Sequence, residues 1–382
     1  MKIIQAEWRD NHAMDQVLAS LHTMTPNLIL AFGSSDRLAA LAEPLAQQFS
    51  DAILLGCTTA GEISTHGVSD DSCVVTALQF DSTRLHSCST VLQSMEASQA
   101  AGQQLAVQLP QAGLRAVIVL GQGVNINGSA MIAGMVDVLG HEVLITGGLA
   151  GDKAAFKETF VLDNAGLHND RISCVGLYGD DLMVSHGSFC GWMPFGPARK
   201  VTRCANNVLF ELDGEPALEV YKRYLGEHAK DLPASGLLFP FAMLGGDHTE
   251  VGLIRTILAV DEALGSLTLA GDIVANGYLR LMHASTDALV DGAEAAAQAA
   301  TMAMRHSGQG LALLVSCVGR KLVMGGRVEE EVEAVVDVLS KNTLVTGFYS
   351  YGEISPFSGE VSCKLHNQTM TITYLTESAA PT

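Results

Sequence analysis

The sequence predicts an α/β fold, a layered α+β arrangement in which two related domains of mixed, largely antiparallel sheets are flanked by helices. Two observations predict this class. Apolar strand-like runs alternate with alanine- and leucine-rich helical runs along the 382 residues. In addition, a glycine-rich motif that ends in glutamate occurs at residues 56–64 and again at residues 347–355. The recurrence indicates internal duplication, and we place the two domains at residues 1–214 and 215–382.

The duplicated motif reads GCTTAGEIS at residues 56–64 and GFYSYGEIS at residues 347–355. Each copy follows a short apolar run, and its glycines suit a turn that needs a positive φ or a close backbone approach. Two weaker copies, at residues 144–152 and 239–247, also join an apolar run and glycines to a carboxylate. The four copies predict turns at the ends of strands. The carboxylates on these turns are Glu62, Asp152, Asp247 and Glu353.

The first half of the chain alternates predicted strands and helices. Residues 72–80 and 85–92 are predicted as adjacent strands, and residues 94–109 as a helix that stops before Pro110. The turn at residues 121–128 has the spacing GxGxxxxG rather than the GxGxxG of dinucleotide sites, so we interpret it as a tight strand–helix connection. The other predicted strands are residues 27–33, 52–55, 115–120, 160–162, 172–178 and 182–186.

An unusual segment, residues 186–197, is predicted as a long loop because it mixes aromatic residues with glycines and prolines. The second half then continues the alternation, and a helix is predicted to start at Glu215-Pro216-Ala217. A further helix follows a capping residue among Ser285, Thr286 and Asp287, and another spans residues 329–340. The predicted strands of this half are residues 207–212, 239–244, 253–260, 266–270, 278–283, 311–316, 343–346 and 369–375.

The charge and the cysteine content of the chain disfavour several classes of function. The chain has 41 acidic and 22 basic residues, a net charge of −19, which disfavours binding to nucleic acids or to anionic membrane surfaces. Its eight cysteines include no CxxC pair, so zinc-finger spacing is absent and reduced thiols are expected. The first 15 residues lack the apolar core of a signal peptide. We therefore expect a cytoplasmic protein.

The chain resembles the FIST family, a bacterial sensory module of two domains. The resemblance is carried by GCTTAGEI at 56–63, GGLAGD at 147–152, HGSFCGWMPFGP at 186–197, ELDGEPALEVY at 211–221 and YGEISP at 351–356. It is most similar to the free-standing haem-binding nitric-oxide sensors (NosP). That resemblance implies haem b as cofactor, a partner histidine kinase and control of cyclic-di-GMP signalling or biofilm formation. Family members carry a run of glycines after His-Gly-Ser, where this chain has Phe189-Cys190-Gly191.

Haem requires an axial ligand and an apolar slot that excludes water. His186 is the first candidate for the iron ligand, because Trp192 and Phe195 follow it and would supply an apolar wall. His283, at the end of a strand, and His248, beside the Gly-Gly-Asp turn, are the alternatives. Each of the three histidines could instead be an ordinary turn or strand-end residue.

The turn carboxylates allow two interpretations. Together with Tyr351 they could line one cleft between the domains and bind an amino acid or another small metabolite. They could instead accept backbone N–H groups and stiffen their own turns. The first interpretation gives an alternative function, a metabolite sensor without haem.

Catalysis is not expected. Cys57 and Ser188 lie beside glycines, but neither stands in a nucleophile elbow of the type GxSxG. A hydrolase that uses one of them is the remaining alternative. A homodimer is compatible with the sequence.

Overall fold

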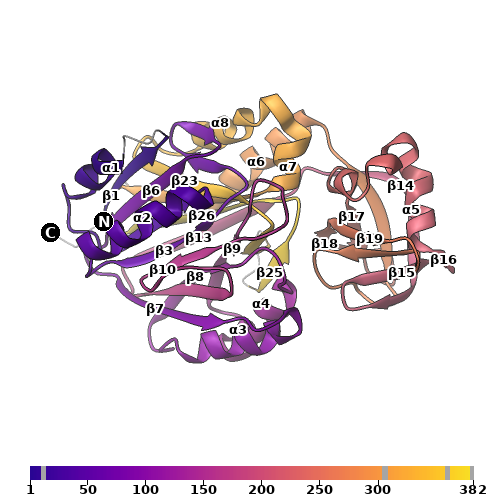
Figure 1. Ribbon diagram of the computed structural model, residues 1–382, viewed down its shortest axis with the longest axis horizontal. Helices are drawn as coiled ribbons and strands as arrows, with labels where there is room; N and C mark the ends of the chain where they lie inside the picture. Colours follow the sequence, from indigo (N-terminus) through magenta and orange to yellow (C-terminus); the bar gives the residue numbers. More distant parts are fainter. Residues whose placement is uncertain (10–13, 303–308, 358–361, 379–382) are drawn as a thin grey trace.

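The structure is a computed structural model that describes residues 1–9, 14–302, 309–357 and 362–378. Figure 1 shows a large body and a smaller lobe side by side. Within the described residues, the body holds three six-stranded sheets and the lobe one sheet of eight strands. The predicted class, α/β with mixed sheets and flanking helices, is confirmed.

The body consists of three consecutive repeats, each of which supplies four strands of one sheet. In every repeat a helical crossover joins two parallel strands, and the first and last strands of the repeat complete the sheet. The first repeat holds β1 (Lys2–Trp8), α1 (Met14–Leu21), β2 (Leu28–Gly33), α2 (Ser35–Gln48), β3 (Ile53–Thr58) and β6 (Cys73–Gln79). The second holds β7 (Arg84–Val91), η1 (Met95–Ala97), α3 (Ser98–Val107), β8 (Leu114–Gly121), α4 (Gly128–Leu139), β9 (Leu144–Leu149) and β12 (Arg171–Tyr178). The third holds β13 (Leu182–Phe189), α6 (Thr286–Thr301), β22 (Gly310–Cys317), α7 (Val318–Met324), η4 (Gly325–Arg327), α8 (Glu329–Val338), β23 (Thr343–Ser350) and β26 (Met370–Glu377).

Each repeat also sends a β-hairpin to the sheet of another repeat. The hairpin β4 (Glu62–Ser64) and β5 (Gly67–Ser69) extends the third sheet, and β10 (Val161–Asp163) and β11 (Gly166–His168) extend the first. The hairpin β24 (Gly352–Pro356) and β25 (Cys363–His366) extends the second sheet. Strands of the two predicted domains, residues 1–214 and 215–382, therefore share sheets in the folded protein.

The turns after β3, β9 and β23 meet one another and hold the three repeats together. We call the ends of these three strands together with the turns after them, residues 56–62, 147–153 and 347–353, the turn ring. The Ala60 amide donates to the Tyr349 carbonyl at 2.8 Å, and the Tyr349 amide donates to the Gly61 carbonyl at 2.8 Å. Gly151 donates to Thr58 at 2.8 Å, and Tyr351 donates to Leu149 at 3.1 Å, which closes the contacts between all three turns.

One glycine in each turn lies where no side chain fits. Gly56, Gly147 and Gly347 occupy equivalent positions in the parallel strand pairs. A Cβ atom on any of them would overlap the carbonyl oxygen of the facing residue. The facing residues are Ala31, Val119 and Leu314. Close backbone approach is therefore the reason for these glycines.

Two of the four predicted copies of the motif, at residues 144–152 and 239–247, are not equivalent to the other two in the folded protein. Glu62 lies opposite Phe348 and Glu353 lies opposite Gly148, and the matching position in the remaining hairpin is Val161, opposite Cys57. Asp152 is therefore not the counterpart of the two glutamates. The copy at residues 239–247 belongs to the lobe and to none of the three repeats.

The lobe is an insertion between β13 and α6 of the third repeat. It packs its own core around Tyr221, Phe241 and Leu279. Its elements are β14 (Met193–Ala205), β15 (Val208–Leu212), β16 (Glu215–Pro216), α5 (Ala217–Leu225), η2 (Gly226–Asp231), η3 (Ala234–Leu237), β17 (Phe241–Leu244), β18 (Glu250–Arg255), β19 (Ile257–Asp261), β20 (Ser266–Leu269) and β21 (Tyr278–His283).

Two local predictions were wrong. Residues 72–80 and 85–92 are not adjacent strands, because β6 lies in the first sheet and β7 at the edge of the second. The connection between them is held by Glu377, whose carboxylate accepts the backbone N–H groups of residues 81–83. Residues 186–197 do not form a long loop, because β13 continues to Phe189 and β14 starts at Met193.

A substitution in the turn ring tests this packing. We expect Gly56→Ala to lower the free energy of unfolding by about 1–3 kcal/mol, because the added methyl group forces two strands apart. Gly246→Ala is the matched control, since its Cβ would meet no atom within 4 Å, and should change stability by less than about 0.5 kcal/mol. Urea unfolding measures both, and equal effects of the two substitutions would contradict the packing argument.

Candidate functional site

The two turn glutamates are buried, and each accepts hydrogen bonds from its own turn and from the residue just before a later strand. The Thr59 hydroxyl donates to Glu62 at 2.5 Å, and the Ser72 hydroxyl donates to its other oxygen at 2.6 Å. Glu353 accepts the Ser350 hydroxyl at 2.6 Å and the Thr369 amide at 3.1 Å. Burial raises the pKa of Glu62, and it raises the pKa of Glu353 to about 8. Both side chains therefore stiffen the turn ring.

Of the other predicted pocket residues, Asp152 and Tyr351 contact each other, whereas Asp247 lies apart from them in the lobe. Asp152 accepts the amides of residues 156–158 and bonds to the Tyr351 hydroxyl, and Tyr351 stacks on Phe156 at 4.2 Å. Asp247 is exposed in the lobe and accepts the Thr249 hydroxyl at 2.6 Å. The four carboxylates do not converge on one cleft.

The predicted haem wall does not form around His186. His186 lies on β13, its Nε2 is 3.1 Å from the Phe357 carbonyl oxygen, and polar Arg115 and Glu142 line the cavity beside it. Trp192 packs instead with Ile254 and Met282, and its indole N–H donates to the Gln368 carbonyl at 2.9 Å. Trp192 and Phe195 therefore do not form the predicted wall beside His186, and the apolar lining of that cavity consists instead of Leu114, Leu139, Val143, Leu144, Leu182 and Val184.

The two alternative histidines lie in the lobe. His283 pairs with Met193 where the chain crosses between lobe and body, and its ring meets the edge of Phe195 at 5.8 Å. Met193 and Phe195 are exposed. His248 stacks on Tyr278 at 3.9 Å. Within the described residues no cluster of three or more His, Cys, Asp or Glu side chains could hold a metal ion.

The candidate nucleophiles of a hydrolase are poorly placed. Cys57 is fully buried, and burial raises the pKa of its thiol well above the ordinary range. Ser188 is also buried, and its hydroxyl donates to the Pro356 carbonyl at 3.3 Å. Among the described residues, neither side chain lines the cavity beside His186 or the cavity that Arg255 borders.

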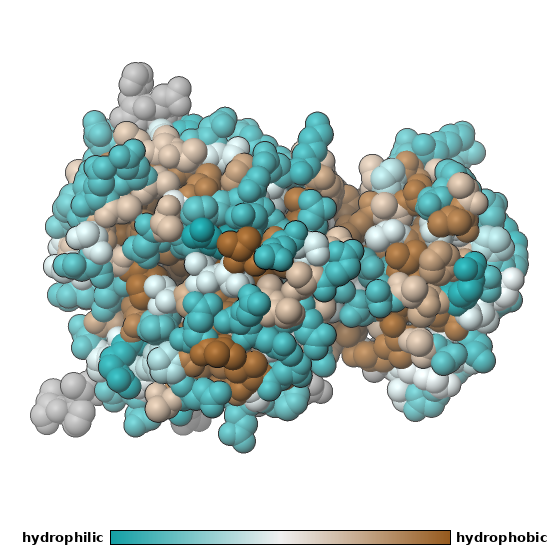
Figure 2. Space-filling model, turned by 60° about the horizontal axis from the view of Figure 1, so that its bottom comes forward, coloured by the Kyte–Doolittle hydropathy of each residue, from teal (hydrophilic) through white to brown (hydrophobic). Residues whose placement is uncertain are grey.

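A cavity of about 660 Å³ lies between the body and the lobe. Figure 2 shows the lobe set off from the body by a groove in which hydrophobic side chains are visible. The body contributes α4 and β25, and the lobe contributes β17, β18 and residues 272–274. The apolar part of the lining consists mainly of Ile132, Val136, Met243, Leu253 and Ile273. The volume suits a small organic ligand.

Arg255 is a buried cation in the wall of this cavity, which Asp137, Asp272 and Lys364 also line. It ends β18 and is 3% exposed. Its Nε donates to the Asp272 carbonyl at 3.1 Å, and its Nη1 donates to the Leu365 carbonyl of the body at 3.2 Å. Among the described residues, its Nη2 has no hydrogen-bond partner and the guanidinium has no ion pair. Burial lowers the pKa of Arg255 to about 10, so the group is still a cation at neutral pH.

A second polar group without a partner lies beside Arg255. The Ser129 hydroxyl, near the start of α4, is buried and has no hydrogen-bond partner within the described residues. A Cβ atom on Gly271 would lie 2.9 Å from Arg255 Nε and 3.0 Å from Ser129 Oγ, so both groups border the space above this glycine. A buried hydroxyl without a partner costs free energy, and a ligand oxygen would remove that cost.

Asp272 completes the polar side of the cavity. Its carboxylate accepts the Asn127 amide at 3.0 Å, and this bond joins the lobe to the start of α4. Asn127 also caps α4 by accepting the Ala130 amide at 3.1 Å. The arrangement offers a cation and a hydroxyl for a ligand anion, and a carboxylate nearby for a ligand amine.

The sequence reasoning missed Arg255, Ser129 and Asp272. A signal was present for Asp272, because Gly271-Asp272 follows a predicted strand in the same way as the glycine–carboxylate motifs. No such signal marks Ser129 or Arg255, since their proximity depends on how the lobe docks against α4.

The fold defines a structural class: a threefold-repeated α/β body with an inserted β-sheet lobe. Comparison with models of protein families identifies the family to which the chain belongs. The FIST N domain model matches residues 27–215 and the FIST C domain model matches residues 217–356. The chain therefore belongs to the FIST family and carries both domains of a FIST sensory protein.

Two individual proteins are similar to the chain, one in the sequence of a part of it and one in a structural alignment over almost all of it. An uncharacterized protein of Methanocaldococcus jannaschii, MJ1623, is 34% identical over 103 residues, which cover 25% of this chain and 19% of that protein. The chain thus matches about a fifth of the length of this relative. The crystal structure of a cyanuric acid hydrolase from A. caulinodans aligns over 99% of both chains with a TM-score of 0.39 and 8% sequence identity.

The helices give no sign of a membrane span. Among the described residues, no helix combines the length and the apolar character needed to cross a bilayer.

The raised pKa of Glu353 predicts how stability depends on pH. Below about pH 4.5 its carboxyl is protonated in both folded and unfolded chains, and its contribution to stability is complete. As the pH rises toward 8, only the unfolded chain ionises at this group. The free energy of unfolding should then fall by up to about 1.4 kcal/mol per pH unit.

Glu353→Gln should flatten this slope, and urea unfolding between pH 4.5 and 8 measures it. Glu333→Gln, at an exposed position on α8, is the matched control and should keep the wild-type slope. A Glu353→Gln protein with the wild-type slope would contradict the assignment of a neutral, buried carboxyl.

Proposed function

We propose that this FIST protein is a sensor of a small metabolite that carries a carboxylate, and that the ligand binds between the body and the lobe. The observation that supports the proposal most is the pairing of Arg255 with the Ser129 hydroxyl in a cavity of about 660 Å³. A guanidinium with a spare N–H edge binds a carboxylate, and the neighbouring hydroxyl supplies another donor. An amino acid is one such ligand, with its amine toward Asp272.

The same site gives a way to transmit binding. The ligand would touch α4 of the body and β18 of the lobe, so it would favour the arrangement in which both walls contact it. The lobe connects to the body through residues 190–192 and 284–285, which are short enough to act as a hinge. The output would be a surface read by a partner histidine kinase, and the net charge of −19 suits a partner with a basic face. The proposal assigns binding, and no catalysis, to the site.

Ligand binding tests the proposal directly. A panel of amino acids and small mono- and dicarboxylic acids is screened by thermal shift, and hits are titrated by calorimetry. For a hit, Arg255→Lys should weaken binding by at least about 30-fold, because a lysine cannot reproduce the guanidinium geometry. Ser129→Ala should weaken it by about 5- to 10-fold.

The matched control is Arg203→Ala, which removes a charge from an exposed position on the lobe. It should bind like the wild type. Equal affinity of the Arg255→Lys and wild-type proteins would contradict the site, and so would a panel without a single carboxylate that binds.

Haem and nitric oxide form a second candidate function, and the observation that favours it is at His283. This histidine has the exposed apolar side chains of Met193 and Phe195 beside it. A haem bound there would supply an iron that takes up a diatomic ligand. His283 would hold the group, and Met193 and Phe195 would shield one face of it from water. The hinge position of His283 would carry the signal toward the kinase.

Haemin titration separates the two candidates. If haem binds at His283, the purified protein gains a Soret band that moves on addition of nitric oxide, and His283→Ala abolishes the band while His248→Ala keeps it. Loss of the Soret band only in His186→Ala would identify His186, the first candidate from the sequence, as the iron ligand. A spectrum without a Soret band would rule out the haem candidate.

A further inference from the structure

Two cysteines face each other at the edge of the second sheet. Cys88 on β7 and Cys174 on β12 are directly opposite in the antiparallel register, and their sulfur atoms are 3.3 Å apart. Residues directly opposite in such a pair have Cα atoms about 4.5–5.5 Å apart, which lies within the range that a disulfide spans. The two sulfurs can therefore reach bonding distance by side-chain rotation.

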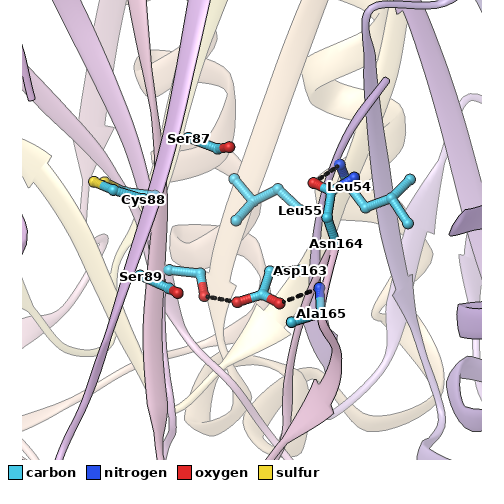
Figure 3. A pocket seen from close by; sticks show the side chains of 10 residues that line it. Leu54, Leu55, Ser87, Cys88, Ser89, Asp163, Asn164 and Ala165 are labelled. Carbon is cyan, nitrogen blue, oxygen red and sulfur yellow. Dashed lines mark hydrogen bonds between the residues drawn. The ribbon is translucent and has the colours of Figure 1, made fainter. Parts of the chain in front are cut away.

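The pair is placed where a small oxidant can reach it. β7 is the last strand of its sheet, and Cys88 is partly exposed, whereas Cys174 is buried. Figure 3 shows the Cys88 side chain on the other side of its strand from Leu55 and Asp163. Its thiol instead approaches α3 and donates to the Leu105 carbonyl at 3.5 Å.

The environment makes the two thiols unequal. The hydrogen bond from the Cys174 thiol favours the thiolate of Cys88 and lowers the pKa of Cys88. The same bond, together with burial, raises the pKa of Cys174. Cys88 is therefore the thiol that reacts first as a nucleophile, and Cys174 is the thiol that attacks the oxidised Cys88 afterwards.

The other six cysteines are placed differently. Cys57, Cys73, Cys317 and Cys363 are buried, and burial raises the pKa of each thiol. Cys190 and Cys204 are partly exposed, but within the described residues neither has a second cysteine sulfur within bonding reach. In the part of the chain that the structure describes, only Cys88 and Cys174 combine partial exposure of one thiol with a neighbouring thiol.

We propose that Cys88 and Cys174 are a redox modification site that a hydroperoxide converts to a disulfide. The Cys88 thiolate attacks the peroxide oxygen, the O–O bond breaks, and the departing alkoxide or hydroxide takes up a proton, which leaves Cys88 as a sulfenic acid. The Cys174 thiol then attacks the Cys88 sulfur, the S–O bond breaks, and water leaves. In sum, two thiols are oxidised to one disulfide. An organic hydroperoxide is reduced to its alcohol and one water is released, whereas hydrogen peroxide gives two waters.

The experiment treats the native full-length protein with stoichiometric hydrogen peroxide, quenches with catalase and alkylates the thiols after unfolding. Two of the eight cysteines should resist alkylation in the wild type, and a digest without reductant should contain the peptide that links Cys88 to Cys174. Dithiothreitol should restore both thiols.

Single variants assign the roles. Cys174→Ser should form no disulfide and should accumulate a sulfenic acid on Cys88 that dimedone traps. Cys190→Ser is the matched control and should form the disulfide like the wild type. Circular dichroism checks that each variant folds. Alkylation of all eight thiols after peroxide treatment would overturn the proposal, and so would oxidation of Cys190 or Cys204 while Cys88 and Cys174 stay reduced.

Discussion

The structure depends on close backbone contact in the turn ring. Three strands carry Gly56, Gly147 and Gly347 near their ends, and each glycine lies against a carbonyl oxygen where a side chain would collide. Main-chain hydrogen bonds then join the three turns, and each hairpin that follows completes the sheet of another repeat. Because every sheet needs a hairpin from elsewhere in the sequence, the repeats stabilise one another and the body forms as a unit.

The rigid body gives the lobe a fixed surface against which to dock. The lobe inserts into the third repeat, yet its Arg255 and Asp272 contact β25 and the residue before α4, which belong to the hairpin of the third repeat and to the second repeat. The cavity therefore lies between elements that are far apart in the sequence. In the described part of the chain, the buried Ser129 hydroxyl at this cavity has no hydrogen-bond partner, whereas the buried glutamates of the turn ring have their hydrogen bonds within the protein.

Much of the fold could be predicted from the sequence, because strands and helices leave local periodic patterns. The motif at residues 56–64 and 347–355 correctly indicated duplication, and each of its glutamates accepts a hydroxyl hydrogen bond from its own turn. The number of repeats was missed because the second repeat has Val161 where the others have glutamate. The site was missed because Arg255 and Ser129 meet only through tertiary docking, which no local pattern records.

A structure of the protein with a bound carboxylate ligand tests the account most directly. The account predicts that the ligand carboxylate lies between Arg255 and Ser129, within hydrogen-bond distance of the Arg255 guanidinium and the Ser129 hydroxyl, with the rest of the molecule against α4 and β18. A ligand bound elsewhere, with the cavity between body and lobe filled only by water, would contradict it.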